Sequence, residues 1–177
     1  MRMWFASLLA LATLCSVAVA KDPMNYAPAE IYTKLRSQAL STTAKALGTK
    51  EQTFGVIMET GYPEAVVTLV ALSDGTASLY FSNGGGMIGL GQHEGPAVAA
   101  RSLISFANHN LKQLTPTTHT PLPRPGYTRF YVLTQSGTLT AEAKEMELGE
   151  NRHVLSPLFY SAQELITEMR EVEESRK

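Results

Sequence analysis

Cysteine is nearly absent from this sequence, with a single residue, Cys15, among 177. Because Cys15 lies in an apolar stretch near the start, the rest of the chain has no disulfide, no cysteine nucleophile and no thiolate metal ligand. An excess of charge is also absent, since 15 Lys and Arg residues face 16 Asp and Glu residues, for a formal net charge of −1. With no basic stripe and no RNA-binding signature, we expect no binding to nucleic acid.

Motifs that carry known chemistry are missing as well. No H-E-x-x-H zinc motif, no G-x-S-x-G nucleophile motif and no Gly-Lys-[Ser/Thr] phosphate motif occurs in the sequence. Two acidic residues, Glu59 and Glu64, flank an expected turn, where carboxylates are usually solvated and say little about glycoside chemistry. We predict no metal and no cofactor. Metal-ligand spacing is absent among the four histidines, which are His93, His109, His119 and His153.

The N-terminal stretch has the organisation of a secretory signal peptide. An apolar run over residues 3–14 is followed by small residues at Ala18 and Ala20, the pattern that precedes a cleavage site. We predict that residues 1–20 are cleaved after Ala20, so that the protein is periplasmic or secreted and has no membrane attachment. An uncleaved leader is the alternative, because residues 3–20 carry no charge and approach the minimum length of a membrane span. The protein would then be a membrane-tethered scaffold.

The remaining residues are enough for one ordinary domain. Hydrophobic residues make up 44% of the sequence, so a full core can form without metals or disulfides. We predict a flexible lead-in over residues 21–27, a single domain over residues 28–170 and a solvated charged tail over residues 171–177.

The first predicted helix begins at Pro28, in the first-turn position that proline tolerates. Its apolar stripe starts at Ile31 and continues to Leu47, and Gly48 is expected to end it. Three weak helix formers at residues 41–43 predict a break within this stretch.

Two further helices are predicted in the second half of the chain. One lies within residues 95–114, with Pro96 in its first position, and the other is capped and started by Ser156 and Pro157. Between them, the proline-rich residues 115–126 are expected to form an extended, stiff spacer.

Five segments have strand-like composition and pair in hairpins. Asp74-Gly75 predicts one tight hairpin, and residues 135–137 predict a second. The middle strand of the first group is apolar on both alternating sides, which is typical of a central strand covered on both faces. The predicted strands are residues 53–59, 65–73, 76–82, 127–134 and 138–143.

The element order is therefore α-βββ-α-ββ-α, an α+β domain with a single antiparallel sheet of about five strands flanked by three helices. This layout resembles the profilin-like architecture, which includes roadblock-type domains. It departs from the roadblock pattern, in which two strands precede the middle helix and three follow it. The segment LVALSDGTASLYFSNGGGMIGLGQHE also resembles a stretch found in small exported bacterial proteins of uncharacterised activity. That resemblance implies no activity.

Five glycines fall between residues 84 and 91, after a predicted strand and before a predicted helix. They match G-x-G-x-x-G, but the preceding strand belongs to an antiparallel hairpin and no acid follows at about 20 residues, so the dinucleotide interpretation lacks its context. We favour a structural role, in which the loop needs positive φ or close backbone approach. A ligand-binding role is the alternative. The five residues are Gly84, Gly85, Gly86, Gly89 and Gly91.

His93 and Glu94 follow directly and are the candidate catalytic pair. An ordinary pair at a helix N-terminus, where a carboxylate suits the helix dipole, is the interpretation we favour. The functional alternative makes the chain a small hydrolase or small-molecule-binding enzyme that uses the Gly84–Gly91 loop with His93 and Glu94. Our leading prediction is instead an exported, non-enzymatic binding or assembly domain. A homodimer or protein partner would contact any apolar sheet face that three helices leave uncovered.

Overall fold

The computed structural model describes residues 27–176, which form an α+β fold with a single antiparallel sheet, as the sequence predicted. The described residues hold seven strands and five α-helices, more than the five and three expected. The helices are α1 (Glu30–Leu40), α2 (Ala44–Leu47), α3 (Glu94–His109), α4 (Glu145–Gly149) and α5 (Ser156–Ser175). The strands are β1 (Thr53–Gly61), β2 (Val66–Leu72), β3 (Ala77–Phe81), β4 (Gly86–Met87), β5 (Thr115–Thr117), β6 (Tyr127–Thr134) and β7 (Gly137–Lys144).

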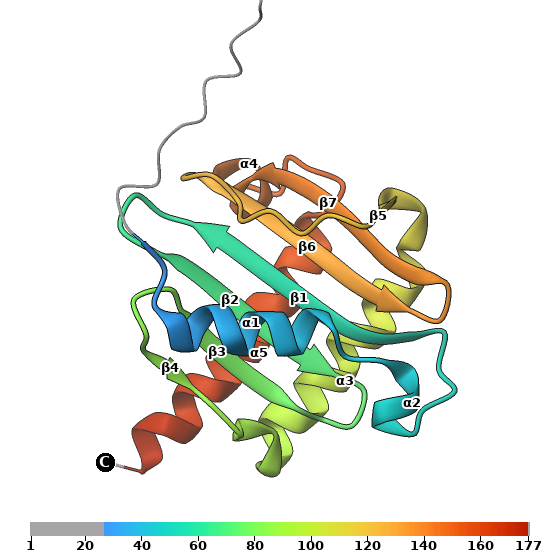
Figure 1. The fold of residues 1–177 in the computed structure, drawn as a ribbon, viewed down its shortest axis with the longest axis horizontal. Helices are drawn as coiled ribbons and strands as arrows, with labels where there is room; N and C mark the ends of the chain where they lie inside the picture. The colour runs from blue at the N-terminus through green and yellow to red at the C-terminus, as the bar shows by residue number, and fades with distance from the viewer. Residues whose placement is uncertain (1–26, 177) are drawn as a thin grey trace, which may run out of the picture.

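The strands are ordered β4-β3-β2-β1-β6-β7-β5, with β1 at the centre. All nine residues of β1 are buried, because helices lie on both sides of the sheet. Figure 1 shows α1 in front of the sheet and α3 and α5 behind it. The prediction that the doubly apolar middle strand of the first group lies centrally, covered on both faces, is confirmed for β2.

Each face of the sheet carries its own apolar core. The face behind α1 packs Ile57, Val70 and Leu133 with Tyr32 of that helix. The opposite face forms the larger core, in which α3 and α5 bury their apolar sides against the strands. Its sheet residues include Val56, Met58, Leu69, Leu79, Phe130 and Val132, and its helix residues include Ala100, Leu103, Ile104, Ala107, Leu158, Ala162, Leu165 and Met169.

The additional strands are short and lie at the two edges of the sheet. β4 comes from the glycine loop and pairs with β3, while β5 comes from the start of the proline-rich segment and pairs with β7. The predicted extended conformation is confirmed for residues 115–117, but their pairing with the sheet was not predicted. Pro116 is accommodated because an edge strand can leave one side of its backbone unpaired.

The predicted apolar stripe over the first helical stretch is confirmed except at its first residue. Ile31, expected to face the core, is 51% exposed, whereas Tyr32 is 2% exposed. The tyrosine can be buried because its hydroxyl oxygen lies 2.9 Å from Oγ1 of Thr68, which satisfies the polar end of the ring. The predicted break is confirmed, since α1 ends at Leu40 and Thr43 caps α2 by accepting a hydrogen bond from the Ala46 amide.

Four helix boundaries also differ from expectation. α1 begins at Glu30 rather than at Pro28, and α3 begins at Glu94, two residues before Pro96. Ser156 is the first residue of α5 rather than its cap. The last helix continues to Ser175, so most of the charged segment predicted as a tail is helical. None of the helices within residues 27–176 is long and apolar enough to cross a membrane.

Candidate functional site

The glycine loop follows the backbone requirements that the sequence suggested. Gly84 and Gly89 have positive φ, at 99° and 75°. Gly86 and Gly91 have no positive φ, but a Cβ at Gly86 would overlap the carbonyl oxygen of Leu79, and one at Gly91 would overlap that of Gly75. Glycine is thus required at four of these positions by conformation or by close approach.

The candidate pair His93 and Glu94 lies at the start of α3. Nε2 of His93 is 2.7 Å from Nη2 of Arg176, and the Glu94 side chain is exposed. A shallow hollow of about 260 Å³ beside the loop is lined by Gly89 and Gly91 together with Asp74 and Gln92, and neither His93 nor Glu94 lines it. The ligand-binding role of these glycines stays a prediction, as does the catalytic role of the pair.

The remaining histidines lie apart from this pair. Nδ1 of His109 is 2.7 Å from the carbonyl oxygen of Ser105, and Nδ1 of His153 accepts a hydrogen bond from the Leu155 amide. In the described part of the chain, no three His, Cys, Asp or Glu side chains are placed to hold a metal ion.

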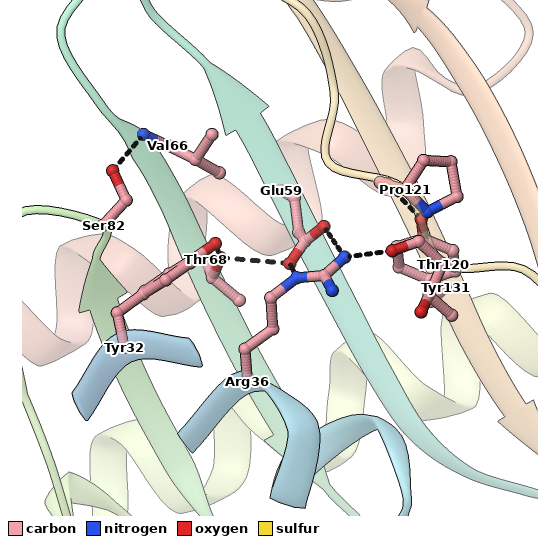
Figure 2. A network of polar contacts seen from close by, with 9 residues as sticks. All are labelled: Tyr32, Arg36, Glu59, Val66, Thr68, Ser82, Thr120, Pro121 and Tyr131. Atoms are coloured by element: carbon pink, nitrogen blue, oxygen red, sulfur yellow. Dashed lines mark hydrogen bonds and ion pairs between the residues drawn. The ribbon is translucent and has the colours of Figure 1, made fainter. Parts of the chain in front are cut away.

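A buried ion pair on the α1 face was not found from the sequence. Glu59, predicted as a solvated acid beside a turn, is 0% exposed because β1 continues past it to Gly61. Arg36 of α1 donates from Nε to Oε1 of Glu59 at 2.6 Å and from Nη2 to Oε2 at 2.8 Å. Figure 2 shows the guanidinium reaching from the helix to this carboxylate.

Further hydrogen bonds extend this ion pair across the sheet and into the proline-rich segment. Thr68 of β2 donates from Oγ1 to Oε1 of Glu59 at 3.2 Å. Nη2 of Arg36 also donates to the carbonyl oxygen of Thr120 at 2.8 Å, and the Tyr131 hydroxyl donates to that of Pro121 at 2.6 Å. The contacts therefore fasten α1 and residues 118–126 to the same face of the sheet (Figure 2).

The titration behaviour of these groups fits a structural role. Burial lowers the pKa of Arg36, but the hydrogen bond and charge of Glu59 more than offset it, so the pKa is raised and the guanidinium stays charged. Burial, with the charge of Glu59, raises the pKa of Tyr131 to about 12. Both oxygens of Glu59 already accept hydrogen bonds within the chain, so the pair holds α1 against the sheet.

A row of polar residues continues from Glu59 along the sheet. The strand register places Thr68, Glu59, Arg129 and Glu142 opposite one another on β2, β1, β6 and β7. Directly paired residues project from the same face, so this row lies under α1 and the proline-rich segment. Nη2 of Arg129 donates to Oε2 of Glu142 at 2.5 Å, whereas Nε of Arg129 is buried without a partner in the described residues.

The opposite face holds a small cavity that is open to solvent and is lined by six apolar and four polar residues, which we call the sheet–α5 cavity. It has a volume of about 100 Å³ and lies between strands β1 to β3 and helix α5. Thr60, which also lines it, is satisfied by the hydroxyl of Thr128 at 2.9 Å. The apolar wall consists of Met58, Val67, Leu69, Leu79, Phe81 and Ile166.

Three polar side chains that solvent reaches form the mouth of the sheet–α5 cavity: Tyr62, Gln163 and Arg170. The Tyr62 hydroxyl donates to Oε1 of Glu145 at 2.6 Å. Burial raises the pKa of Tyr62, the hydrogen bond to Glu145 raises it further, and the charge of Arg170 opposes this rise. Tyr62 is therefore neutral at physiological pH. The sequence does not reveal this cavity, because its walls combine three consecutive strands with α5, which lies near the end of the chain.

Two other clefts are more polar. One, of about 290 Å³, lies where the start of β1 meets α3 and is lined by Thr53, Arg101 and Asn108 among others. The other, of similar volume, separates α1 from the proline-rich segment and is lined mainly by Ser and Thr side chains beside Arg36. No protein-family model, curated protein or solved structure matches the chain.

Proposed function

We propose that this chain is an exported, non-enzymatic binding domain whose ligand inserts an apolar group into the sheet–α5 cavity. The observation that carries the proposal is the incomplete cover that α5 gives to one sheet face. Next to the buried Leu69 and Leu79, the neighbouring Val67 and Phe81 are only partly buried. An apolar concavity with a few polar groups at its mouth is the usual form of a small-molecule site.

The apolar surface extends beyond the cavity itself. Met87 of β4 and Val172 of α5 are also partly exposed and pack against the same core. From the sequence, a partner was predicted to contact any apolar sheet face that the helices leave uncovered, and this opening is the part of the face that meets the condition. A homodimer or protein partner that contacts an apolar sheet face would have to use the same opening.

The cavity volume limits the ligand to a short apolar group. An apolar cavity of about 150 Å³ holds benzene, so a volume of about 100 Å³ suits something smaller, such as an alkyl chain of about four carbons. The walls offer van der Waals contacts on several sides, which favours a flexible chain over a flat ring.

The non-enzymatic part of the proposal rests on where the polar groups lie. Arg36 and Glu59 bind one another, and their further hydrogen bonds go to the Thr120 carbonyl and the Thr68 hydroxyl, on the sheet face opposite the cavity. The alternative, a small hydrolase, would need His93 and Glu94 at the hollow that Gly89 and Gly91 line, and they do not line it.

Export belongs to the proposal as well and rests on the leader sequence, whose residues lie outside those that the structure describes. The profilin-like resemblance is also part of the proposal, supported by the single antiparallel sheet with helices on both faces. If the leader is retained, the same binding domain is tethered to a membrane.

The neutral probe pentan-1-ol tests this function on the full chain. We expect saturable binding, followed by NMR of the methyl groups, with shifts confined to Met58, Leu79 and Ile166. Val67→Phe should abolish the shifts, because the larger side chain occupies the cavity, whereas Val98→Phe on the exposed side of α3 should leave them unchanged. The proposal is overturned if pentan-1-ol causes no saturable shift, or if the shifts persist in Val67→Phe.

A further inference from the structure

We infer that the ligand of the sheet–α5 cavity is a short-chain monocarboxylate, bound with its carboxylate against Arg170 and its alkyl chain inside the cavity. This inference rests on the proposed function and adds the chemical class of the ligand. It is carried by the combination of an apolar interior with an unpaired cation at the mouth.

Arg170 has no anionic partner within residues 27–176. The five ion pairs in this part of the chain use other cations, including Arg36, Arg129 and Arg152, and no carboxylate pairs with Arg170. Glu145 does not line the cavity, and its carboxylate accepts the hydrogen bond of Tyr62. The guanidinium is therefore available to an anion, and its planar donors match the geometry of a carboxylate.

The position of Arg170 on α5 aligns it with the apolar wall. Gln163, Ile166 and Arg170 are spaced by three and four residues, so they lie on one face of the helix. All three line the cavity, with the apolar Ile166 between the two polar side chains. A ligand whose chain contacts Ile166 would place its head group within reach of Arg170.

The other polar groups at the mouth add hydrogen-bonding capacity without adding charge. The side-chain amide of Gln163 makes no hydrogen bond in the described part of the chain and can donate to a carboxylate oxygen. Tyr62 is neutral at physiological pH, because burial raises the pKa of its hydroxyl. The cation at the mouth is thus Arg170, and the expected ligand carries one negative charge.

The size of the cavity sets the length of the ligand. Acetate would leave the apolar interior empty, whereas a carboxylate with four further carbons would fill about 100 Å³. Pentanoate is therefore the probe, and pentanamide is its neutral isostere. Acetate serves as the carboxylate that lacks the chain.

The test compares the dissociation constants of these three compounds for the full chain, by calorimetry or NMR titration. We expect pentanoate to bind about two- to fivefold more tightly than pentanamide, the ratio that an exposed charge contact provides. Acetate should bind more weakly than either. Arg170→Gln should remove the preference for pentanoate and leave pentanamide binding unchanged. The matched control is Arg176→Gln, an exposed arginine just beyond the end of α5 that does not line the cavity.

The outcomes separate this inference from the proposed function. Equal binding of pentanoate and pentanamide overturns the choice of a carboxylate and leaves the binding domain intact. An equal loss of pentanoate binding in Arg170→Gln and Arg176→Gln shows a general charge effect and also overturns the inference. If neither five-carbon compound binds, the proposed function fails and the inference fails with it.

Discussion

At the scale of single residues, the buried pair of Arg36 and Glu59 matters for stability mainly because removing one partner destabilises the folded state. Glu59 is 0% exposed and Arg36 is 13% exposed, so removing one partner leaves a charge that water can hardly solvate. We expect Arg36→Met or Glu59→Leu alone to lower the free energy of unfolding by about 3–5 kcal/mol. The double variant should lose less than either single variant, because no buried charge remains. Urea unfolding of the four proteins measures this cycle.

The exposed pair of Lys144 and Glu147 provides the matched control for that cycle. Its side chains are 53% and 32% exposed, so Lys144→Met should change the free energy of unfolding by no more than about 1 kcal/mol. If the loss of unfolding free energy in the double variant equals the sum of the losses in Arg36→Met and Glu59→Leu, the two side chains do not act as a pair.

The glycine loop gives a second prediction at this scale. Gly91→Ala should cost about 1–3 kcal/mol, because the added Cβ meets the backbone of Gly75. Gly89→Ala should cost about 1 kcal/mol, because φ is 75° and space is available. Gly149→Ala, with neither constraint, should be neutral or stabilising, and thermal melts would rank the three. Wild-type-like melting of the Gly89 and Gly91 variants, with phosphate raising the wild-type melting temperature, would instead favour a ligand site.

At the scale of elements, the proline-rich segment is fastened to β6 by Tyr131. The folded state holds the pKa of this hydroxyl at about 12, whereas an unfolded tyrosine titrates near 10. The unfolded chain therefore loses its proton first as pH rises. The resulting stabilisation is complete below about pH 10 and is lost as pH rises towards 12.

The corresponding experiment measures the free energy of unfolding between pH 9 and 12. We expect the fall with pH to be shallower in Tyr131→Phe than in wild type, because the variant has lost this ionisation. Tyr160→Phe removes an exposed tyrosine that hydrogen-bonds the Gly149 carbonyl, and it should retain the wild-type slope. Identical slopes in wild type and Tyr131→Phe would show that this hydroxyl does not titrate in the window.

Elements with local signals were predictable from the sequence. Gly48 ends α2 in the left-handed region, and the hairpin at Gln135-Ser136 follows its turn residues. Contacts between residues distant in the chain could not be predicted from the sequence. Ile31 and Tyr32 are neighbours with similar apolar character, and the buried Tyr32 contacts Thr68, which lies 36 residues away in the chain.

The candidate site also depends on contacts between residues that are distant in the chain. Nothing beside Glu59 in the sequence indicates that Arg36 will pair with it, because the contact depends on how α1 lies over the sheet. The sheet–α5 cavity is equally non-local, since it forms where the side chain of Ile166 meets those of β1, β2 and β3. A single sequence holds no local pattern for such a gap.

At the scale of the whole molecule, the leader predicts where the mature protein begins. Cleavage after Ala20 should give an N-terminus at Lys21 on protein recovered outside the cytoplasm. Intact-mass spectrometry of protein from the producing cells measures this directly. Recovery of membrane-bound protein that retains residues 1–20 would contradict export with cleavage and favour the tethered form.

The molecule as a whole places two kinds of chemistry on opposite faces of one sheet. The α1 face holds the ion pair of Arg36 and Glu59, which fastens α1 to the sheet, and the α5 face holds a mainly apolar cavity with an unpaired arginine at its mouth. A crystal structure of the full chain grown with pentanoate tests this division most directly. The account predicts pentanoate between Leu79 and Ile166, with its carboxylate at Arg170. Pentanoate found only in the cleft beside Arg101, or a cavity closed by its own side chains, would contradict it.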